Sequence, residues 1–179
     1  MQSETASIVA AAVENNQNQR EKAGKYLTFK LSSEEYGLEI LKVKEIIGLI
    51  SITQIPRTPD HIRGVINLRG TVIPVMDLRI KFGMEAIEST SETCIIVVEV
   101  NQEEQTVRMG ILVDSVSEVL DIASSEIEDT PEFGSEVNTD FIQAMGKTRD
   151  RVIMLLEINE VLSGDDITLA NKTAEPSDG

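Results

Sequence analysis

Residues 62–79 read IRGVINLRGTVIPVMDLR, and residues 142–158, IQAMGKTRDRVIMLLEI, are a degenerate echo of them. Four positions keep one spacing of 80 residues, pairing Ile62 with Ile142, Arg69 with Arg149, Ile73 with Ile153 and Asp77 with Glu157. Arg69-Gly70 is typical of a hairpin tip, because glycine tolerates the positive φ that a tight turn requires. A segment that recurs in this way predicts two similar folding units.

A second match lies upstream of each hairpin. Residues 43–47, VKEII, align with residues 116–120, VSEVL, at a spacing of 73. The spacing grows to 80 further along, so the second copy carries a longer middle loop within residues 129–140. Each copy holds only about 65–75 residues, which is marginal for independent folding. We therefore expect the two copies to pack together.

Hydrophobic patterning predicts a mainly β fold. Strands are expected at 26–31, 36–40, 42–47, 50–55, 94–100, 107–113 and 116–120, a series typical of small barrels. Segments 73–76 and 152–156 are apolar on both strand faces, so we expect both faces to be covered at a shared hydrophobic seam. A few short helices are expected near 59–63, 78–82 and 159–162. Residues 1–24 predict a flexible leader and residues 164–179 a flexible tail.

Charge and cysteine content narrow the class of protein. The 179 residues carry 31 acidic and 16 basic side chains, a formal net charge of −15, which argues against nucleic acid and against anionic membrane surfaces. No run approaches the roughly 20 apolar residues of a membrane span. The single cysteine, Cys94, lies in an apolar run and predicts a small buried side chain in a cytoplasmic protein.

No catalytic or metal-binding constellation emerges. His61 is the only histidine, so histidine clusters are excluded; a Ser-His-Asp set is possible by count, but no G-x-S-x-G elbow is present and a solvated loop histidine is favoured. The sequence has no phosphate loop. Asp165-Asp166 is interpreted as a solvated pair rather than a metal site, and Asp77 and Arg79 as an ion pair on one strand face. We expect no cofactor, no metal and no enzymatic activity.

Three residues stand out as candidate interaction sites, each with a structural alternative. Glu45 is either a partner contact or a solvent-facing strand residue, and Arg69 is either a contact or a solubilising hairpin tip. Phe133, beside Glu132 in a loop with proline and glycine, either packs under its own loop or binds a partner. The residues alone leave these alternatives open.

Residues 35–46, 62–79, 110–120 and 131–133 together resemble the CheW family of chemotaxis coupling proteins, and the resemblance covers about residues 25–163. It implies two five-stranded barrels of the Src-homology-3 type around a shared hydrophobic seam. Barrel one is expected at about 25–92 and barrel two at about 93–150, with a strand and short helix at 151–163 completing the pair. The polar Gly146-Lys147-Thr148, where the first copy has Ile66-Asn67-Leu68, leaves the role of the second hairpin open.

The resemblance also implies a function. It is that of a non-enzymatic adaptor, monomeric when free, which joins the cytoplasmic tips of chemoreceptors to the regulatory domain of the histidine kinase CheA in membrane-associated arrays. An alternative is a similar adaptor in a parallel chemosensory system for twitching motility or development. The implied receptor-facing residues are Val43, Glu45, Gly64, Arg69 and Cys94. The implied kinase contacts are Ile52 and Ile55 in the first barrel, and Glu132 and Phe133 in a ring-closing loop.

Overall fold

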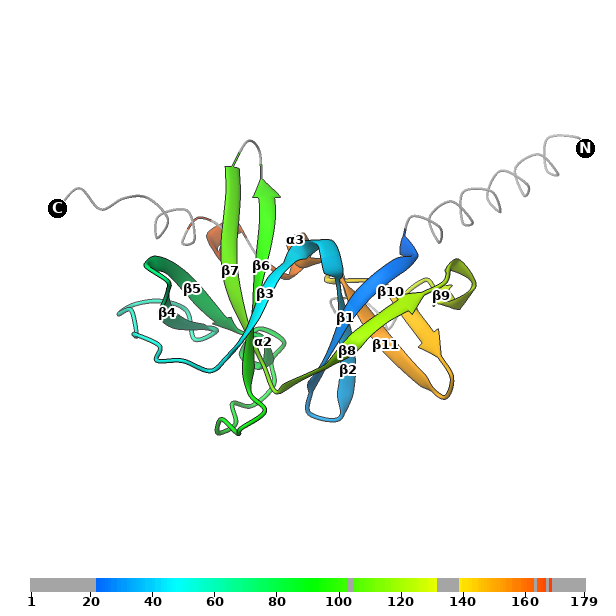
Figure 1. The fold of residues 1–179 in the computed structure, drawn as a ribbon, viewed down its shortest axis with the longest axis horizontal. Coiled ribbons are helices and arrows are strands. Elements are labelled where there is room, and N and C mark those ends of the chain that lie inside the picture. The colour runs from blue at the N-terminus through cyan, green and yellow to red at the C-terminus, as the bar shows by residue number, and fades with distance from the viewer. Residues whose placement is uncertain (1–21, 103–104, 132–138, 163, 167, 169–179) are drawn as a thin grey trace, which may run out of the picture.

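The computed structural model describes residues 22–102, 105–131, 139–162, 164–166 and 168. Within them the chain forms two sheets that pack side by side (Figure 1). The strands are β1 (Gly24–Leu31), β2 (Glu34–Glu39), β3 (Val43–Gly48), β4 (Ile62–Leu68), β5 (Thr71–Asp77), β6 (Cys94–Gln102), β7 (Gln105–Val113), β8 (Ser115–Ile122), β9 (Ile127–Glu128), β10 (Ile142–Thr148) and β11 (Arg151–Leu156). The short helices are α2 (Leu78–Lys81) and α3 (Ile158–Val161), with 3₁₀ turns η1 (Ile40–Lys42) and η2 (Ser124–Glu126). The predicted mainly β fold is confirmed.

The two sheets do not coincide with the two sequence copies. The five-stranded unit has the strand order β3-β6-β7-β5-β4, and the six-stranded unit has the order β8-β1-β2-β11-β10-β9. Each unit therefore combines the first hairpin of one copy with the later strands of the other. The expected division into barrels at 25–92 and 93–150 is wrong in this respect, because the chain crosses between the units at η1 and again at Asp114.

Parallel strand pairs explain why the copies interlock. The second strand of each copy pairs in parallel with the last strand of the other, aligning Gly110 with Val75 and Gly37 with Leu155. Glycine lets the strands pack closely at both places. A Cβ at Gly110 would lie 2.8 Å from Cγ2 of Ile95, and one at Gly37 would lie 3.0 Å from Cδ2 of Leu155. Sequence periodicity cannot predict this exchange of hairpins, because it indicates which face of a strand is buried and not which strand pairs with which.

Both sheets close in the same way. In the five-stranded unit the chain beyond β3 reaches β4, where Thr53 and Val65 exchange two backbone hydrogen bonds of 2.8 Å. In the six-stranded unit the chain beyond β8 forms β9, which pairs with β10 at Glu128 and Met145. The sixth strand is thus the counterpart of the single bridge at Thr53. The strand expected over 50–55 is limited to that bridge.

Three apolar clusters fill the fold. One lies inside the five-stranded unit around Val75 and Ile95, and another lies inside the six-stranded unit around Tyr26 and Leu155. The largest contains side chains of both units, among them Phe29 and Met109, and is the predicted shared seam. An aromatic chain also spans it, with ring centroids 5.7 Å apart for Tyr36 and Phe82 and 4.4 Å apart for Phe82 and Phe141.

The repeat of the sequence is visible in local geometry. Arg69 and Arg149 both occupy hairpin tips at φ 52°. Asp77 and Glu157 both cap the helix that follows, accepting hydrogen bonds from the backbone N–H of Arg79 and Asn159. The helices predicted near 78–82 and 159–162 are confirmed. The one predicted near 59–63 is wrong, because β4 begins at residue 62.

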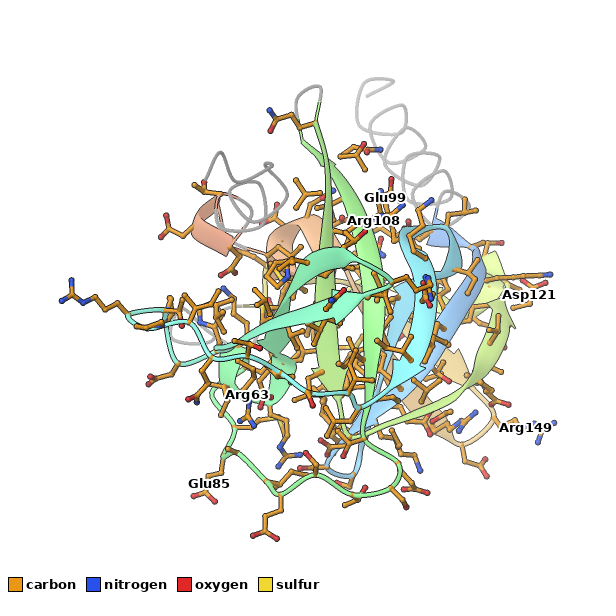
Figure 2. All side chains as sticks on the ribbon, turned by 60° about the vertical axis from the view of Figure 1, so that its left-hand side comes forward. Arg63, Glu85, Glu99, Arg108, Asp121 and Arg149 are labelled. Carbon is orange, nitrogen blue, oxygen red and sulfur yellow. The ribbon has the colours of Figure 1, made fainter. Side chains whose placement is uncertain are left out.

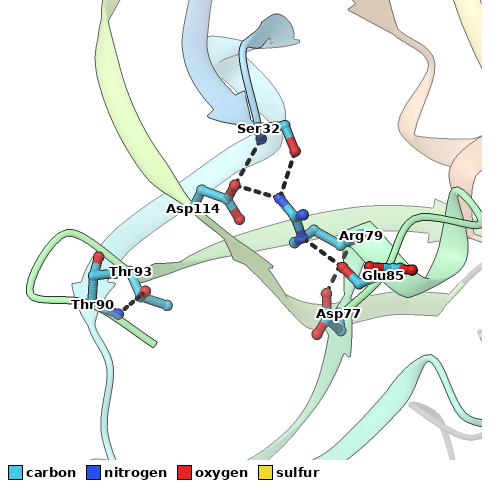
Figure 3. A network of polar contacts seen from close by, with 7 residues as sticks. All are labelled: Ser32, Asp77, Arg79, Glu85, Thr90, Thr93 and Asp114. Carbon is cyan, nitrogen blue, oxygen red and sulfur yellow. Dashed lines mark hydrogen bonds and ion pairs between the residues drawn. The ribbon is translucent and has the colours of Figure 1, made fainter. Parts of the chain in front are cut away.

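A buried arginine fastens the two units together (Figure 3). Arg79, which is 8% exposed, donates to Oδ2 of Asp114 at 2.6 Å and to Oγ of Ser32 at 3.0 Å. Ser32 lies in the β1–β2 turn of the six-stranded unit, whereas Arg79 belongs to α2 beside the five-stranded unit. The expected ion pair between Asp77 and Arg79 is wrong, because α2 begins between them and turns the arginine toward Asp114.

Candidate functional site

The rim of the five-stranded unit carries an exposed ion pair. Arg69 donates from Nη1 to Oε1 of Glu45 at 3.0 Å and from Nη2 to Oε2, a two-pronged arrangement. Its hydrogen bonds hold the pKa of the Glu45 carboxyl below its ordinary value. The side chain of Arg69 is 70% exposed and that of Glu45 is 30% exposed. The structure therefore brings together two of the residues expected to face the receptor.

The hairpin geometry places Arg69 at this rim. Arg69 and Gly70 both have positive φ, at 52° and 89°, which is the pattern of a tight turn matched to the twist of the strands. Oδ1 of Asn67 accepts a hydrogen bond of 2.8 Å from the N–H of Gly70 and closes the turn. Glu45 comes from β3, at the other end of the strand order, so the pair joins the two edges of the sheet.

Gly64 lies below the rim, where the backbone requires glycine. Its φ is +140°, and a Cβ there would lie 2.0 Å from the carbonyl oxygen of Thr53. The neighbouring Val65 is the residue that bonds to Thr53. Gly64 is therefore explained by closure of the sheet, and a contact with the receptor stays a prediction.

Val43 and Cys94 lie on the opposite face of the same edge. Val43 pairs with Val98 and Cys94 pairs with Gly48, and both side chains are half-buried against the seam. Burial raises the pKa of the Cys94 thiol, so it is held as a neutral group. Ile46, 44% exposed, pairs with the seam residue Ile96 and adds apolar surface to this face. Ile46 cannot be recognised from sequence as a surface residue, because an isoleucine in a strand ordinarily predicts a buried side chain.

The candidate kinase-facing residues lie on the segment between β3 and β4. Ile52 packs against the interior cluster, whereas Ile55 lines a surface cavity of about 680 Å³ together with Pro56, Pro59 and Arg63. Leu49 and Ile50 precede them and are 40% and 39% exposed. These two apolar side chains were not singled out by sequence. Their signal is the run of apolar residues and glycine at 46–50, which continues beyond the end of β3 at Gly48.

Two further sequence-based interpretations change. His61 is not a solvated loop residue, because its Nε2 lies 2.7 Å from Oδ1 of Asp166. Asp166 in turn is buried and not part of a solvated acidic pair. Residues 164–166 are helical, so the described start of the predicted tail is ordered structure.

Glu132 and Phe133, the candidate ring-closing contacts, lie outside the described residues. Within the described part of the chain, no cluster of three or more histidine, cysteine or acidic side chains is arranged to hold a metal ion. The helices described there are all too short or too polar to cross a membrane.

Two packed sheets of this topology, with an exposed ion pair at one rim and the enclosed seam between them, define a binding scaffold. The chain matches the CheW-like domain family over residues 25–166 and belongs to that family, whose members are scaffolds of bacterial chemotaxis. The matched range therefore includes strands of both units and the helical segment that contains Asp166.

Relatives of known type agree. The chain is 38% identical over 150 residues to chemotaxis protein CheW of Klebsiella aerogenes, covering 84% of this chain and 88% of that protein. It is 34% identical to chemotaxis protein CheW of Bacillus subtilis over 139 residues, covering 77% and 86%. The crystal structure of the scaffolding protein TtCheW from Thermoanaerobacter tengcongensis is 36% identical and superposes with a TM-score of 0.71, covering 80% of this chain and 95% of that one.

Proposed function

We propose that this chain is a non-enzymatic adaptor that couples the cytoplasmic tips of chemoreceptors to the regulatory domain of the histidine kinase CheA. It acts in the cytoplasm, is monomeric when free, and is recruited to membrane-associated receptor arrays. Membership of the CheW family supports this role. The observation that carries it is the exposed, pre-oriented Arg69–Glu45 pair.

The rim pair suits a contact with a partner protein. A guanidinium has about five N–H donors, and the two directed at Glu45 leave others to meet carboxylates or backbone carbonyls of a receptor. Because Glu45 already fixes the orientation of Arg69, binding costs less side-chain entropy than it would for a mobile arginine. Arginine is also a common centre of binding energy at interfaces.

The seam-side face of β3 and β6 supplies apolar surface for the same partner. Val43 and Cys94 are half-buried there and Ile46 is 44% exposed. An amphipathic helix binds such a surface through side chains spaced three and four residues apart. The receptor tip is proposed to lay a helix on this face and to meet Arg69 at the rim.

The segment between β3 and β4 is the proposed kinase contact. Leu49 and Ile50 expose apolar side chains, and Ile55 borders the 680 Å³ cavity. An adaptor that holds the receptor on one surface and the kinase on another raises their effective concentration for each other, without any chemical step. The loop with Glu132 and Phe133 is proposed as a second, ring-closing contact.

The test replaces Arg69 by histidine and uses Arg149→His as the matched control. Both residues occupy hairpin tips at φ 52°, and Figure 2 shows Arg149 projecting from the edge of the six-stranded unit. We expect Arg69→His to weaken co-sedimentation with receptor-containing membranes by about tenfold or more, whereas Arg149→His keeps it. Circular dichroism of both variants should match that of the unaltered protein. Undiminished receptor binding by folded Arg69→His would refute the proposed site.

The kinase half of the proposal has its own measurement. The unaltered chain is expected to bind the purified regulatory domain of CheA in solution, and Arg69→His is expected to leave that binding intact. The kinase recovered with the chain from its own cells identifies which chemosensory system it serves.

A further inference from the structure

A buried carboxylate holds the C-terminal segment against the five-stranded unit. Asp166 is 2% exposed, with Oδ1 2.7 Å from Nε2 of His61 and Oδ2 3.0 Å from Nζ of Lys81. Lys81 is the last residue of α2, and His61 lies in the turn before β4. One carboxylate therefore connects three segments that are far apart in sequence. A buried carboxylate is tolerated only with such partners, so its position and theirs depend on each other.

Hydrogen bonds within residues 55–62 connect His61 to the residues that precede it. The N–H of Ile62 donates to the carbonyl oxygen of Pro59 at 3.0 Å, which closes the turn that contains His61. Oγ1 of Thr58 donates to the carbonyl oxygen of Ile55 at 3.0 Å. These bonds form a local chain from the buried carboxylate to Ile55, the residue that borders the cavity.

The segment between Thr53 and His61 is held at its two ends. One end is the backbone bridge from Thr53 to Val65. At the other end His61 is held twice, by its side-chain contact with Asp166 and by its carbonyl oxygen, which accepts a hydrogen bond of 2.7 Å from the N–H of Asp77. Between them Arg57 adopts a positive φ of 64°, a conformation that a non-glycine residue keeps only where its surroundings impose it. Removing the contact with Asp166 would leave the end at His61 with its main-chain hydrogen bonds alone, in a segment that includes this left-handed position.

We propose that Asp166 is a positioning residue for the kinase-facing surface: it clamps His61 and thereby sets the conformation of residues 54–60. The proposal rests on the proposed function, because it assigns the kinase contact to that segment. Asp166 itself is buried and does not touch the kinase. The C-terminal segment thus acts as a brace, whose effect on binding is transmitted through the turn at Pro59 and His61.

The test compares Asp166→Ala with Asp165→Ala, its exposed neighbour, which loses the same charge without losing the clamp. Asp166→Asn is a third variant that keeps the shape and one acceptor oxygen, in case the alanine variant does not fold. Two quantities are measured for each: the affinity for the CheA regulatory domain, and hydrogen exchange at the N–H of Ile62. Receptor co-sedimentation is the control for a general loss of structure.

We expect Asp166→Ala to bind the kinase domain about tenfold more weakly, while receptor binding stays unchanged. Exchange at Ile62 should quicken about tenfold, because its hydrogen bond to Pro59 opens more often. Asp165→Ala should match the unaltered protein, and Asp166→Asn should lie between. The same kinase affinity in all variants would overturn the brace while leaving the proposed function intact, and so would parallel losses of kinase and receptor binding. Failure of the unaltered chain to bind the kinase would overturn the proposed function, even where exchange at Ile62 still responds to Asp166.

Discussion

The rims of the two units have equivalent positions in the sequence repeat, but the arginine that pairs with the rim glutamate differs between them. Glu45 and Glu118 lie 73 residues apart at the same position of the repeat, and each is paired with an arginine of the nearby hairpin. In the five-stranded unit that arginine is Arg69, at the tip. In the six-stranded unit it is Arg151, two residues beyond the tip residue Arg149, and it also contacts Glu35 at 2.7 Å.

This difference separates a rim whose arginine faces outward from a rim whose arginine is held against the protein. Arg151 is shared between two carboxylates on different strands, so its donors are directed inward at the protein, and its side chain is 43% exposed. Arg69 has one carboxylate partner among the contacts described and is 70% exposed. The receptor contact proposed above therefore falls on the rim whose arginine faces outward, and the position of the arginine within its hairpin is what distinguishes the two rims.

The largest effect should come from the bulges in the first strands of the two hairpins, where the register shifts between Ile62 and Gly64 and between Ile142 and Ala144. Gly64 and Ala144 occupy equivalent positions, but only Gly64 has a positive φ and would place a Cβ 2.0 Å from a backbone oxygen. We expect Gly64→Ala to lower the free energy of unfolding by about 3 kcal/mol, measured by urea denaturation. The reciprocal Ala144→Gly should cost only about 1 kcal/mol. Equal losses in both variants would show that the positive φ of Gly64 and its close approach to Thr53 do not govern the cost.

A smaller effect should distinguish the two parallel pairings that interlock the copies. At Gly110 an added Cβ meets Cγ2 of Ile95 at 2.8 Å, and that side chain is β-branched and buried. At Gly37 it meets Cδ2 of Leu155 at 3.0 Å, a longer contact with an equally buried side chain, whose Cδ2 lies one bond further from the backbone than Cγ2 of Ile95. We expect Gly110→Ala to cost about 2 kcal/mol and Gly37→Ala about 1 kcal/mol or less. The opposite order in thermal unfolding would show that the rigidity of the neighbouring side chain does not govern the cost.

The smallest effect concerns the charge state of the Arg69–Glu45 pair. The pKa of Glu45 is lowered in the folded protein by its hydrogen bonds from Arg69. The unfolded chain therefore binds a proton at higher pH than the folded one. The contribution of the pair to stability is complete above the ordinary glutamate range and is lost as the pH falls through the lowered pKa. Carboxyl NMR should show the titration midpoint of Glu45 moving upward in Arg69→Gln. A midpoint that does not move would mean that the pair does not persist in solution.

Much of the fold follows from local sequence features. Alternation of apolar residues places most strands within a few residues. The segment 73–76 is buried on both strand faces as expected, whereas in the segment 152–156 Val152 is 54% exposed and Met154 is half-buried, so coverage there is incomplete. Arg69-Gly70 correctly predicts a tight turn. The run 50–55 misleads, because Pro56 and the need to reach Val65 leave only one bridge at Thr53. Each of these features depends on neighbours in the chain, which is why pattern and turn chemistry suffice for most of them.

The candidate site also has a part that the sequence predicts and a part that depends on tertiary contacts. The resemblance to the CheW family names Glu45 and Arg69, but their partnership depends on a sheet that curls until its two edges meet. Ile46 is exposed on an edge strand, and Leu49 and Ile50 are exposed on the segment that follows it. A hydrophobic pattern does not report which strand forms the edge of a sheet. The buried contact between Asp166 and His61 joins residues that are 105 apart in the sequence. Composition predicts a flexible tail at Asp166 and so gives no sign of this contact.

The amino-acid sequence predicts the duplication, the strand content, the seam and the family, because each depends on residue types at fixed spacings. Tertiary contacts establish which copy's hairpin enters which sheet, because close packing at Gly37 and Gly110 requires a specific partner across the fold. They also establish that one rim arginine is shared inward and the other faces outward. Two copies with nearly the same local preferences thus acquire different surfaces only when they interlock.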